Sequence, residues 1–223
     1  MANTLFFIVL PYVALVTLIG GSMYRYFNRG FKVSSLSSQF LEGKKLFYGS
    51  LAFHWGIVFL FFGHLVAFLF PRSVILWNSI PVRLFILEIT AFGFGLLTLF
   101  GLLALIYRRI DTPRLWFVTN RMDIFVYLIL ILQIVTGLWI AVEFRWGSSW
   151  FASVLTPYLR SIFVFNPDMA AVAAMPFMIK LHIISAYVLI GMIPFTRFIH
   201  FLVLPLAYIR RPYQVVIRDR KHA

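Results

Sequence analysis

The sequence contains no cysteine. This absence excludes disulfides, and it also excludes zinc or iron–sulfur centres held by thiolates of this chain. Charged residues are scarce too, at 12% of 223 residues, whereas a soluble domain carries roughly a quarter. Any iron bound by this chain therefore needs nitrogen ligands, and the chain is expected to lie in a membrane.

Apolar residues dominate the sequence. They make up 62% of it, with 26 phenylalanines and a mean hydropathy of +0.92. Five apolar runs are long enough to cross a bilayer, for which a helix needs about 20 residues. They are approximately 5–24, 46–70, 84–107, 122–142 and 181–209. The first follows MANT, which has no Lys or Arg, so we expect a retained span rather than a signal peptide. The prediction is a single all-α domain, a bundle of five transmembrane helices.

The Lys and Arg residues that give the net charge of +13 are placed unevenly along the chain, and their placement indicates the membrane topology. Fourteen basic residues fall in three segments, 25–45, 108–121 and 210–221, which lie on one side of the predicted bundle. The opposite side carries five: Arg72, Arg83, Arg145, Arg160 and Lys180. This bias predicts an outside N-terminus and a cytoplasmic C-terminus in a multi-pass protein of the cell (cytoplasmic) membrane. Because the basic residues flank apolar runs next to membrane lipid, nucleic acid is not an expected partner.

A long outer loop is predicted over 143–180. Its stretch WFASVLTPYLRSIFVF at 150–165 is aromatic and weakly charged. Such a composition is typical of a helix at the membrane interface, and NPD at 166–168 is expected to end it.

Four of the five histidines fall in only two spans. His54 and His64 lie in the second and His182 and His200 in the fifth, while His222 sits in the basic tail. The two spans are antiparallel in the predicted topology. They therefore offer one pair toward the cytoplasm, His54 with His200, and one toward the exterior, His64 with His182.

Helical geometry supports this pairing in part. His182 and His200 are 18 residues apart, or five turns, so an unbroken helix presents both on one face. The depths of the two pairs fit less well. The ten residues from His54 to His64 rise about 15 Å along a helix, whereas the eighteen from His182 to His200 rise about 27 Å. Pro194 can kink the fifth span and thereby reduce the mismatch.

Two histidines on facing helices can hold a haem iron axially. Such an iron has no open position, so it transfers electrons rather than reacting with a bound molecule. The alternatives are histidines that form interhelical hydrogen bonds, a metal transporter, or a proton relay. A proton relay would recruit buried carboxylates, and only Glu88 lies well inside a predicted span. Flanking small residues give clearance for a cofactor or for helix packing: Gly56, Gly63, Ser185 and Gly191. Arg197 is a candidate partner for a haem propionate or for lipid phosphate.

Two long stretches resemble the gamma subunit of respiratory nitrate reductase. They are RYFNRGFKVSSLSSQFLEGKKLFYGSLAFHWGIVFLFFGH and IKLHIISAYVLIGMIPFTRFIHFLVLPLAYIRRPYQVV, and MDIFVYLILILQIVTG between them is also similar. The resemblance implies a five-helix cytochrome b with two haem b groups, which anchors an iron–sulfur subunit and a molybdenum-cofactor catalytic subunit. It assigns His54 and His200 to the inner (proximal) haem, and His64 and His182 to the outer (distal) haem.

The resemblance also implies that the chain is the quinol-oxidising subunit of the complex. Quinol is expected near the outer haem, beside Gly63 and His64. The family uses a lysine near the start of the third helix, but here the nearest cation is Arg83 in SIPVRLF, which is either a substitute hydrogen-bond donor or an interfacial anchor. Nitrate itself is expected to react on a partner subunit. Related dihaem cytochromes serve reductases for sulfur compounds or other oxyanions, so the final acceptor stays open.

Overall fold

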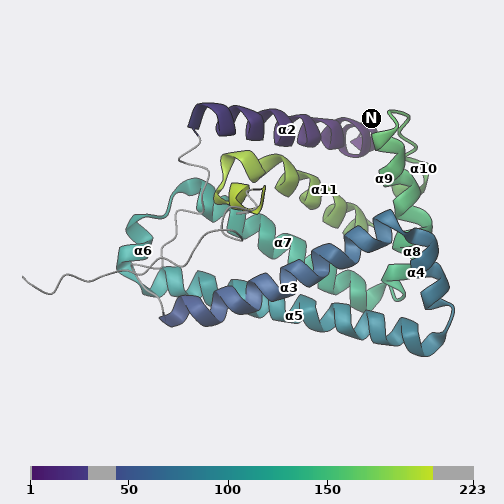
Figure 1. Cartoon of the computed structure of the whole chain (residues 1–223), viewed down its shortest axis with the longest axis horizontal. Coiled ribbons are helices and arrows are strands. Elements are labelled where there is room, and N and C mark those ends of the chain that lie inside the picture. Colours follow the sequence, from purple (N-terminus) through teal and green to yellow (C-terminus); the bar gives the residue numbers. More distant parts are fainter. Residues whose placement is uncertain (1, 30–43, 203–223) are drawn as a thin grey trace, which may run out of the picture.

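The computed structural model describes residues 2–29 and 44–202, and every regular element in these ranges is a helix. Five helices are long and apolar enough to cross a membrane: Ala2–Asn28, Lys45–Leu69, Pro81–Asp111, Arg121–Glu143 and Phe177–Phe195. The all-α fold with five candidate spans is therefore confirmed. Figure 1 shows these helices lying side by side along the long axis of the molecule.

The first four long helices correspond closely to the predicted runs. The first comprises α1 (Ala2–Thr4), a π-helical turn η1 (Leu5–Val9) and α2 (Leu10–Arg29). The others are α3 (Lys44–Leu69), α5 (Pro81–Asp111) and α7 (Arg121–Glu143). Each extends a few residues beyond its apolar run, because helix ends outside the hydrocarbon can carry polar residues.

Proline and a capping box set several helix starts. Pro71 opens α4 (Pro71–Asn78), Pro81 opens α5 and Pro113 opens α6 (Pro113–Phe117). Proline suits a first turn, where no backbone N–H is needed. The α7 helix begins with a capping box, in which the Asp123 N–H donates to Asn120 Oδ1 (2.7 Å) and the Asn120 N–H donates to Asp123 Oδ2 (3.2 Å).

Two glycines bring α3 and α5 into backbone contact. A Cβ at Gly101 on α5 would overlap the backbone of Phe53, and one at Gly56 on α3 would overlap Thr98. Such small-residue contacts let transmembrane helices approach closely. Gly56, which follows His54, therefore serves helix packing. The other neighbours are α5 with α7, α7 with α11 (Phe177–Met192) and α11 with α2.

Short helices cover one end of the bundle. They are α4, α8 (Gly147–Trp150), the π-helical turn η3 (Phe151–Leu155), α9 (Thr156–Phe163) and α10 (Ala170–Ala173), grouped on the right of Figure 1. The predicted helix in the loop 143–180 is present and ends at Phe163, before Asn166. Tyr158 and Ile162 are buried, so this segment packs onto the bundle.

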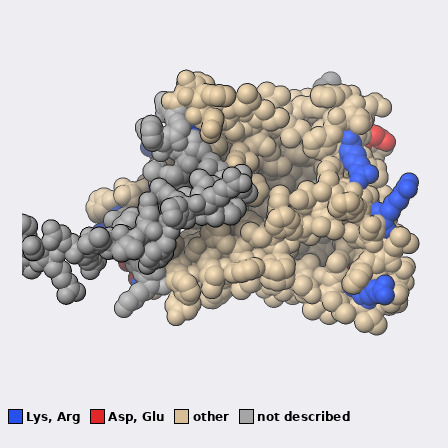
Figure 2. Space-filling view, viewed as in Figure 1, with Lys and Arg blue, Asp and Glu red and all other residues tan. Residues whose placement is uncertain are grey.

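The surface of the bundle is apolar around its middle. Figure 2 shows Lys and Arg at both ends of the bundle, whereas the middle of this face shows no charged side chain. Large apolar residues such as Phe59, Phe100 and Leu128 are exposed on the long helices. Burying such a surface requires a hydrocarbon environment, in agreement with a multi-pass membrane protein.

The fifth span differs from its prediction. It starts at Phe177, α11 ends at Met192, and the 3₁₀ turn η4 (Ile193–Phe195) follows. The backbone is extended at Thr196, and a second 3₁₀ segment, η5 (Arg197–Leu202), carries His200. The five-turn argument for one unbroken helix from His182 to His200 is therefore wrong, because the chain breaks after Pro194. Residues 203–209 of the predicted span lie outside the described ranges.

Candidate functional site: two pairs of histidines

His54 and His200 lie together although 146 positions separate them in the sequence. Their ring centroids are 6.4 Å apart, with an interplanar angle of 62°. Two imidazoles that share one metal through bonds of about 2 Å have centroids about 6 Å apart. The spacing therefore suits a single metal ion between the two rings.

Hydrogen bonds assign the tautomer of three histidines. Backbone carbonyls lie 2.7 Å from Nδ1 of His54, 2.8 Å from Nδ1 of His64 and 2.6 Å from Nδ1 of His200. A carbonyl only accepts, so each Nδ1 carries the proton and each Nε2 carries a lone pair. This arrangement is typical of metal-ligating histidines, whose second nitrogen is fixed by a protein acceptor.

His182 has polar partners on α7 for both ring nitrogens. The Thr136 hydroxyl donates to the Leu132 carbonyl (2.7 Å), so it accepts from His182 Nδ1 at 3.0 Å. The Gln133 amide donates to His182 Nε2 at 3.1 Å, and Gln133 Oε1 accepts from the Ser185 hydroxyl. His182 is therefore the same tautomer as the other three, but its Nε2 already has a donor.

His64 is the neighbour of His182 from the other helix. The two are close enough to interact electrostatically. The edge of the Phe151 ring meets His64 at 5.4 Å between centroids, so η3 covers this histidine from the capped end of the bundle. His54 thus lies next to His200, and His64 lies within electrostatic range of His182; that these are two pairs of haem ligands stays a prediction.

The structure separates the roles of the flanking small residues. A Cβ at Gly63 would meet nothing within 4 Å, whereas Gly191 packs against Ala14. Open space therefore lies at Gly63 rather than at Gly56. An open groove of ≈ 510 Å³ adjoins His54, a size within the usual range of ligand sites. It is lined by residues of α3: Leu46, Phe47, Ser50, Leu51, His54, Trp55 and Val58.

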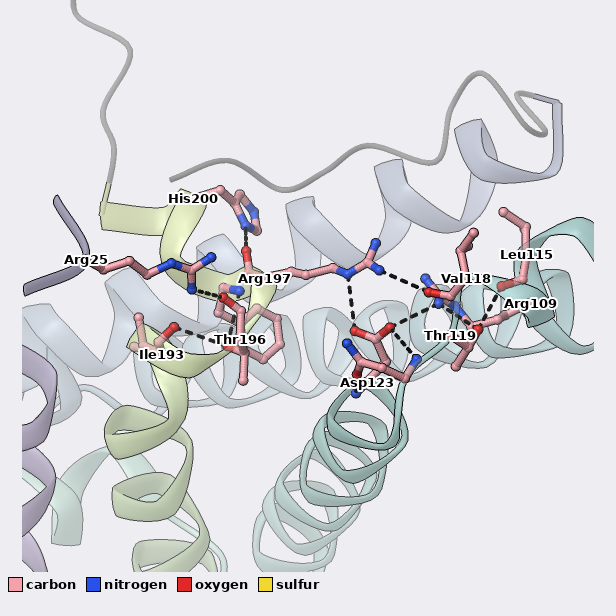
Figure 3. Close-up of polar contacts among 12 residues, drawn as sticks. Arg25, Arg109, Leu115, Val118, Thr119, Asp123, Ile193, Thr196, Arg197 and His200 are labelled. Atoms are coloured by element: carbon pink, nitrogen blue, oxygen red, sulfur yellow. Dashed lines mark hydrogen bonds and ion pairs between the residues drawn. The ribbon is translucent and has the colours of Figure 1, made fainter. Parts of the chain in front are cut away.

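The two candidate arginines contact protein groups. The Arg83 guanidinium lies over the Trp77 ring, 5.1 Å from its centroid. The Arg197 guanidinium pairs with Asp123 (Nε to Oδ1, 3.2 Å) and donates to the Val118 carbonyl (3.3 Å) (Figure 3). The Trp77 contact is compatible with both roles considered for Arg83, the hydrogen-bond donor and the interfacial anchor. For Arg197 the contacts are with Asp123 and Val118, neither of which the sequence had suggested.

The Glu88 carboxylate, which a proton relay could have used, binds the segment that covers the end of the bundle. Its Oε1 accepts from the backbone N–H (2.9 Å) and the hydroxyl (2.6 Å) of Ser148 in α8. Asn78 donates to the same hydroxyl at 2.9 Å. The carboxylate therefore joins α5 to the segment that covers the bundle end.

Several residues that support the histidines were missed in the sequence. Gln133 and Thr136 are polar residues three positions apart within an apolar span, LILILQIVTG. That spacing places both on one helix face and could have marked a buried polar contact. Ser50, whose hydroxyl lies 3.2 Å from His54 Nδ1, gave no comparable signal.

This donor set fits haem. Each of the four imidazoles has Nδ1 held by a protein acceptor, so Nε2 is the atom that would bind an iron; for His182 this requires the Gln133 amide to leave Nε2. Among residues 2–29 and 44–202, no group of three His, Asp or Glu side chains converges to hold a metal ion. The arrangement is thus one of pairs rather than a cluster of protein ligands.

Comparison with known proteins gives a consistent result. The family described as "Nitrate reductase gamma subunit" matches residues 3–219. The nitrate reductase gamma chain of Bacillus subtilis is 34% identical over 95% of this chain and 96% of its own length. The respiratory nitrate reductase 2 gamma chain of Escherichia coli is 30% identical over 98% of both chains. A nitrate reductase-like protein of Mycobacterium tuberculosis is 29% identical over 99% of this chain but only 34% of its own length. This chain therefore belongs to the nitrate reductase gamma subunit family, as a membrane-anchored electron-transfer subunit of a nitrate reductase.

Proposed function

We propose that this chain is a dihaem cytochrome b that oxidises quinol near the outer face and passes electrons to the iron–sulfur subunit of its nitrate reductase. The observation that carries the proposal is the inner histidine pair, with ring centroids 6.4 Å apart and both Nδ1 atoms bonded to carbonyls. Family membership supports the same reading.

His54 and His200 would hold the inner haem b, and His64 and His182 the outer one. When bound, each haem supplies a one-electron carrier whose two axial positions are both taken by imidazole. The chain's own part is to fix these rings. The carbonyls of Ser50, Leu60 and Arg197 and the hydroxyl of Thr136 orient them, since each accepts an Nδ1 proton.

The proposed orientation follows the positive-inside rule. The inner pair lies toward the end that carries Arg25 and the basic segment 108–121, and this end would face the cytoplasm. The outer pair lies toward the end capped by α4, α8 and α9, which would face the exterior of the cytoplasmic membrane. The iron–sulfur subunit and the molybdenum-cofactor subunit would dock on the cytoplasmic side.

Quinol would bind at the outer end, beside Gly63 and His64. The open space at Gly63 supports this position, because a flat ring needs a surface without side chains. Arg83 lies at the start of α5, where its guanidinium can donate to a quinone oxygen while it stacks on Trp77. Protons released by quinol would leave on the outer side, because the proposed quinol site lies at the end of the bundle that would face the exterior.

The proposal is tested on the complex purified with its partner subunits. We expect a b-type α band in the reduced-minus-oxidised spectrum, two haems per gamma chain, and nitrate reduction with quinol as donor. Replacing His64 should abolish nitrate reduction by quinol but not by a reduced dye that feeds the catalytic subunit directly. A complex without haem b, or one whose quinol activity survives the loss of His64, would refute the proposal.

A further inference from the structure

His200 is carried by a turn that α11 does not position. The helix ends at Met192, and Thr196 is extended (φ −117°, ψ 178°) between η4 and η5. The Phe198 N–H donates to the Thr196 hydroxyl at 3.2 Å, which starts the new turn. The rigidity of α11 is therefore lost before His200, and other contacts must place this histidine.

Arg197 connects the His200 ring to α7. Its carbonyl accepts from His200 Nδ1 at 2.6 Å, while its guanidinium reaches Asp123 at 3.2 Å. Figure 3 shows the side chain extended between the turn and the start of α7. Arg197 thus contacts the His200 imidazole through its backbone carbonyl and the Asp123 carboxylate of α7 through its side chain.

Asp123 is a fixed anchor for this connection. Its side chain is only 12% exposed, and it takes part in the capping box with Asn120. On its other side lies Arg109, with Nη1 3.4 Å from Oδ2, and Arg109 also donates to the Thr119 hydroxyl at 2.9 Å. Water screens the charges of such a shielded pair less than those of an exposed pair, and removing one partner leaves the other charge uncompensated.

A second arginine holds the same turn from the opposite side. Arg25 on α2 donates to the carbonyls of Pro194 (2.7 Å) and Thr196 (3.0 Å), at the break that precedes η5. These acceptors lie in η4 and at its C-cap, where carbonyls at a helix end lack helical partners. The turn that carries His200 is therefore held between α2 and α7 by charged side chains.

We propose that Asp123 and Arg197 are positioning residues for His200, and thereby set the properties of the inner haem. This inference rests on the proposed function, in which His200 is an axial ligand. The hydrogen bond from Nδ1–H to the Arg197 carbonyl increases electron donation by the imidazole. Without the ion pair the carbonyl is less firmly held, the hydrogen bond weakens, and the reduction potential of the inner haem rises.

The test is a redox titration of the purified complex, followed by optical and electron paramagnetic resonance spectra. The inner haem signal is first identified as the one lost in His200→Ala, which leaves no side-chain ligand at this position. In Asp123→Asn and Arg197→Gln we expect this signal to shift to higher potential and to change its g-values, while the outer haem signal stays unchanged. Asp123→Glu should restore most of the wild-type behaviour, because it keeps the charge.

The matched control is Asp111→Asn. Asp111 forms an ion pair with Lys45 at the same end of the bundle, but on α5 and α3 rather than at the His200 turn. It should leave both haem signals unchanged. If Asp123→Asn does not accumulate, Arg197→Gln and the milder Arg197→Lys give the same readout.

Two outcomes would overturn the inference. One is an inner haem with wild-type potential and g-values in both variants; the other is an equal change of both haems, which indicates general loosening of the bundle. A wild-type complex without haem b would instead contradict the proposed function. The two failures are therefore distinguishable.

Discussion

Gln133 on α7 donates to Nε2 of His182 on α11, with 3.1 Å between the nitrogens. The same amide accepts from Ser185, so Gln133 bridges two positions of α11 within the apolar part of the bundle. Nε2 is the atom that would ligate the outer haem. A haem bound there would replace the Gln133 amide at Nε2, so α7 becomes part of the proposed site although it contributes no histidine.

Thr136→Val is expected to weaken binding of the outer haem. The substitution keeps the side-chain shape but removes the oxygen that accepts from His182 Nδ1 at 3.0 Å. Loss of a partner of this kind costs about 10–100-fold in metal affinity. The measurement is haem content after dilution of purified complex, with Thr98→Val as the control because Thr98 is buried on α5 and bonds only the Phe94 carbonyl. Equal haem retention in both variants would contradict the role of Thr136.

Double replacements should reveal the pairing of the histidines. If His54 and His200 hold one haem, replacing both with Ala should lose the same single haem as either replacement alone. Combining His54→Ala with His64→Ala should lose both haems, because these residues belong to different pairs. Haem stoichiometry by the pyridine haemochrome spectrum measures this. Additive losses within a pair would show that the pairing is wrong.

Gly63→Leu is expected to impair quinol oxidation without unfolding the protein. A Cβ at Gly63 meets nothing within 4 Å, so the fold tolerates the side chain, but it fills the space proposed for quinol or the outer haem. Gly93→Leu on α5 is the matched control, since a Cβ there also meets nothing within 4 Å. We expect quinol-dependent nitrate reduction to fall at least about tenfold, equivalent to about 1.4 kcal/mol, in Gly63→Leu only. Equal activities of the two variants would argue against a ligand at Gly63.

Gly101→Ala should destabilise the contact between α3 and α5. Its new methyl group would meet the Phe53 backbone, including Cα at 2.7 Å, which cannot move aside as a side chain can. Overpacking of this kind costs about 1–3 kcal/mol. Thermal unfolding in detergent measures the loss, and Gly20→Ala on α2 is the control because its methyl group enters open space. Unchanged stability of Gly101→Ala would mean that the helices can separate at no cost.

Tyr158→Phe should loosen the capped end and alter its response to pH. The buried phenol donates to the Phe7 carbonyl at 2.8 Å, and leaving that carbonyl without a donor costs about 1–3 kcal/mol. Burial raises the pKa of Tyr158 above its ordinary value of 10.0. The neutral phenol is thus favoured in the folded state, and this stabilisation is complete below about pH 10 and decreases as pH rises toward the higher folded pKa.

Unfolding temperatures measured on both sides of pH 10 test this expectation. Wild type should lose stability more steeply at high pH than Tyr158→Phe, because the variant has no phenol to ionise at this position. Tyr12→Phe is a suitable comparison, since Tyr12 also donates to a backbone carbonyl of the cap, that of Ile162 at 3.0 Å. Parallel curves for wild type and Tyr158→Phe would contradict the assigned pH dependence.

The five spans were predictable from residue order, whereas the pairing of the histidines as haem ligands stays a prediction. A bilayer demands runs of about 20 apolar residues, and antiparallel connection then sets relative depth. His54 and His200 meet as this reasoning requires, with their rings 6.4 Å apart. The helix at 156–163 followed from its aromatic composition and its closing NPD.

Other features depend on contacts between segments remote in sequence, which periodicity does not encode. Gly56 was equally suited to cofactor clearance and to helix packing until the approach of Thr98 assigned it to packing. Gln133 and Thr136 acquire their role from the rotation of α7 toward His182. The helix breaks before Thr196, where Pro194 has no backbone N–H to donate. Arg25 binds the carbonyls of Pro194 and Thr196, and Arg197 binds the carboxylate of Asp123. Hydrophobicity therefore sets which segments enter the membrane, whereas the pairing of individual polar groups fixes how each ligand is held.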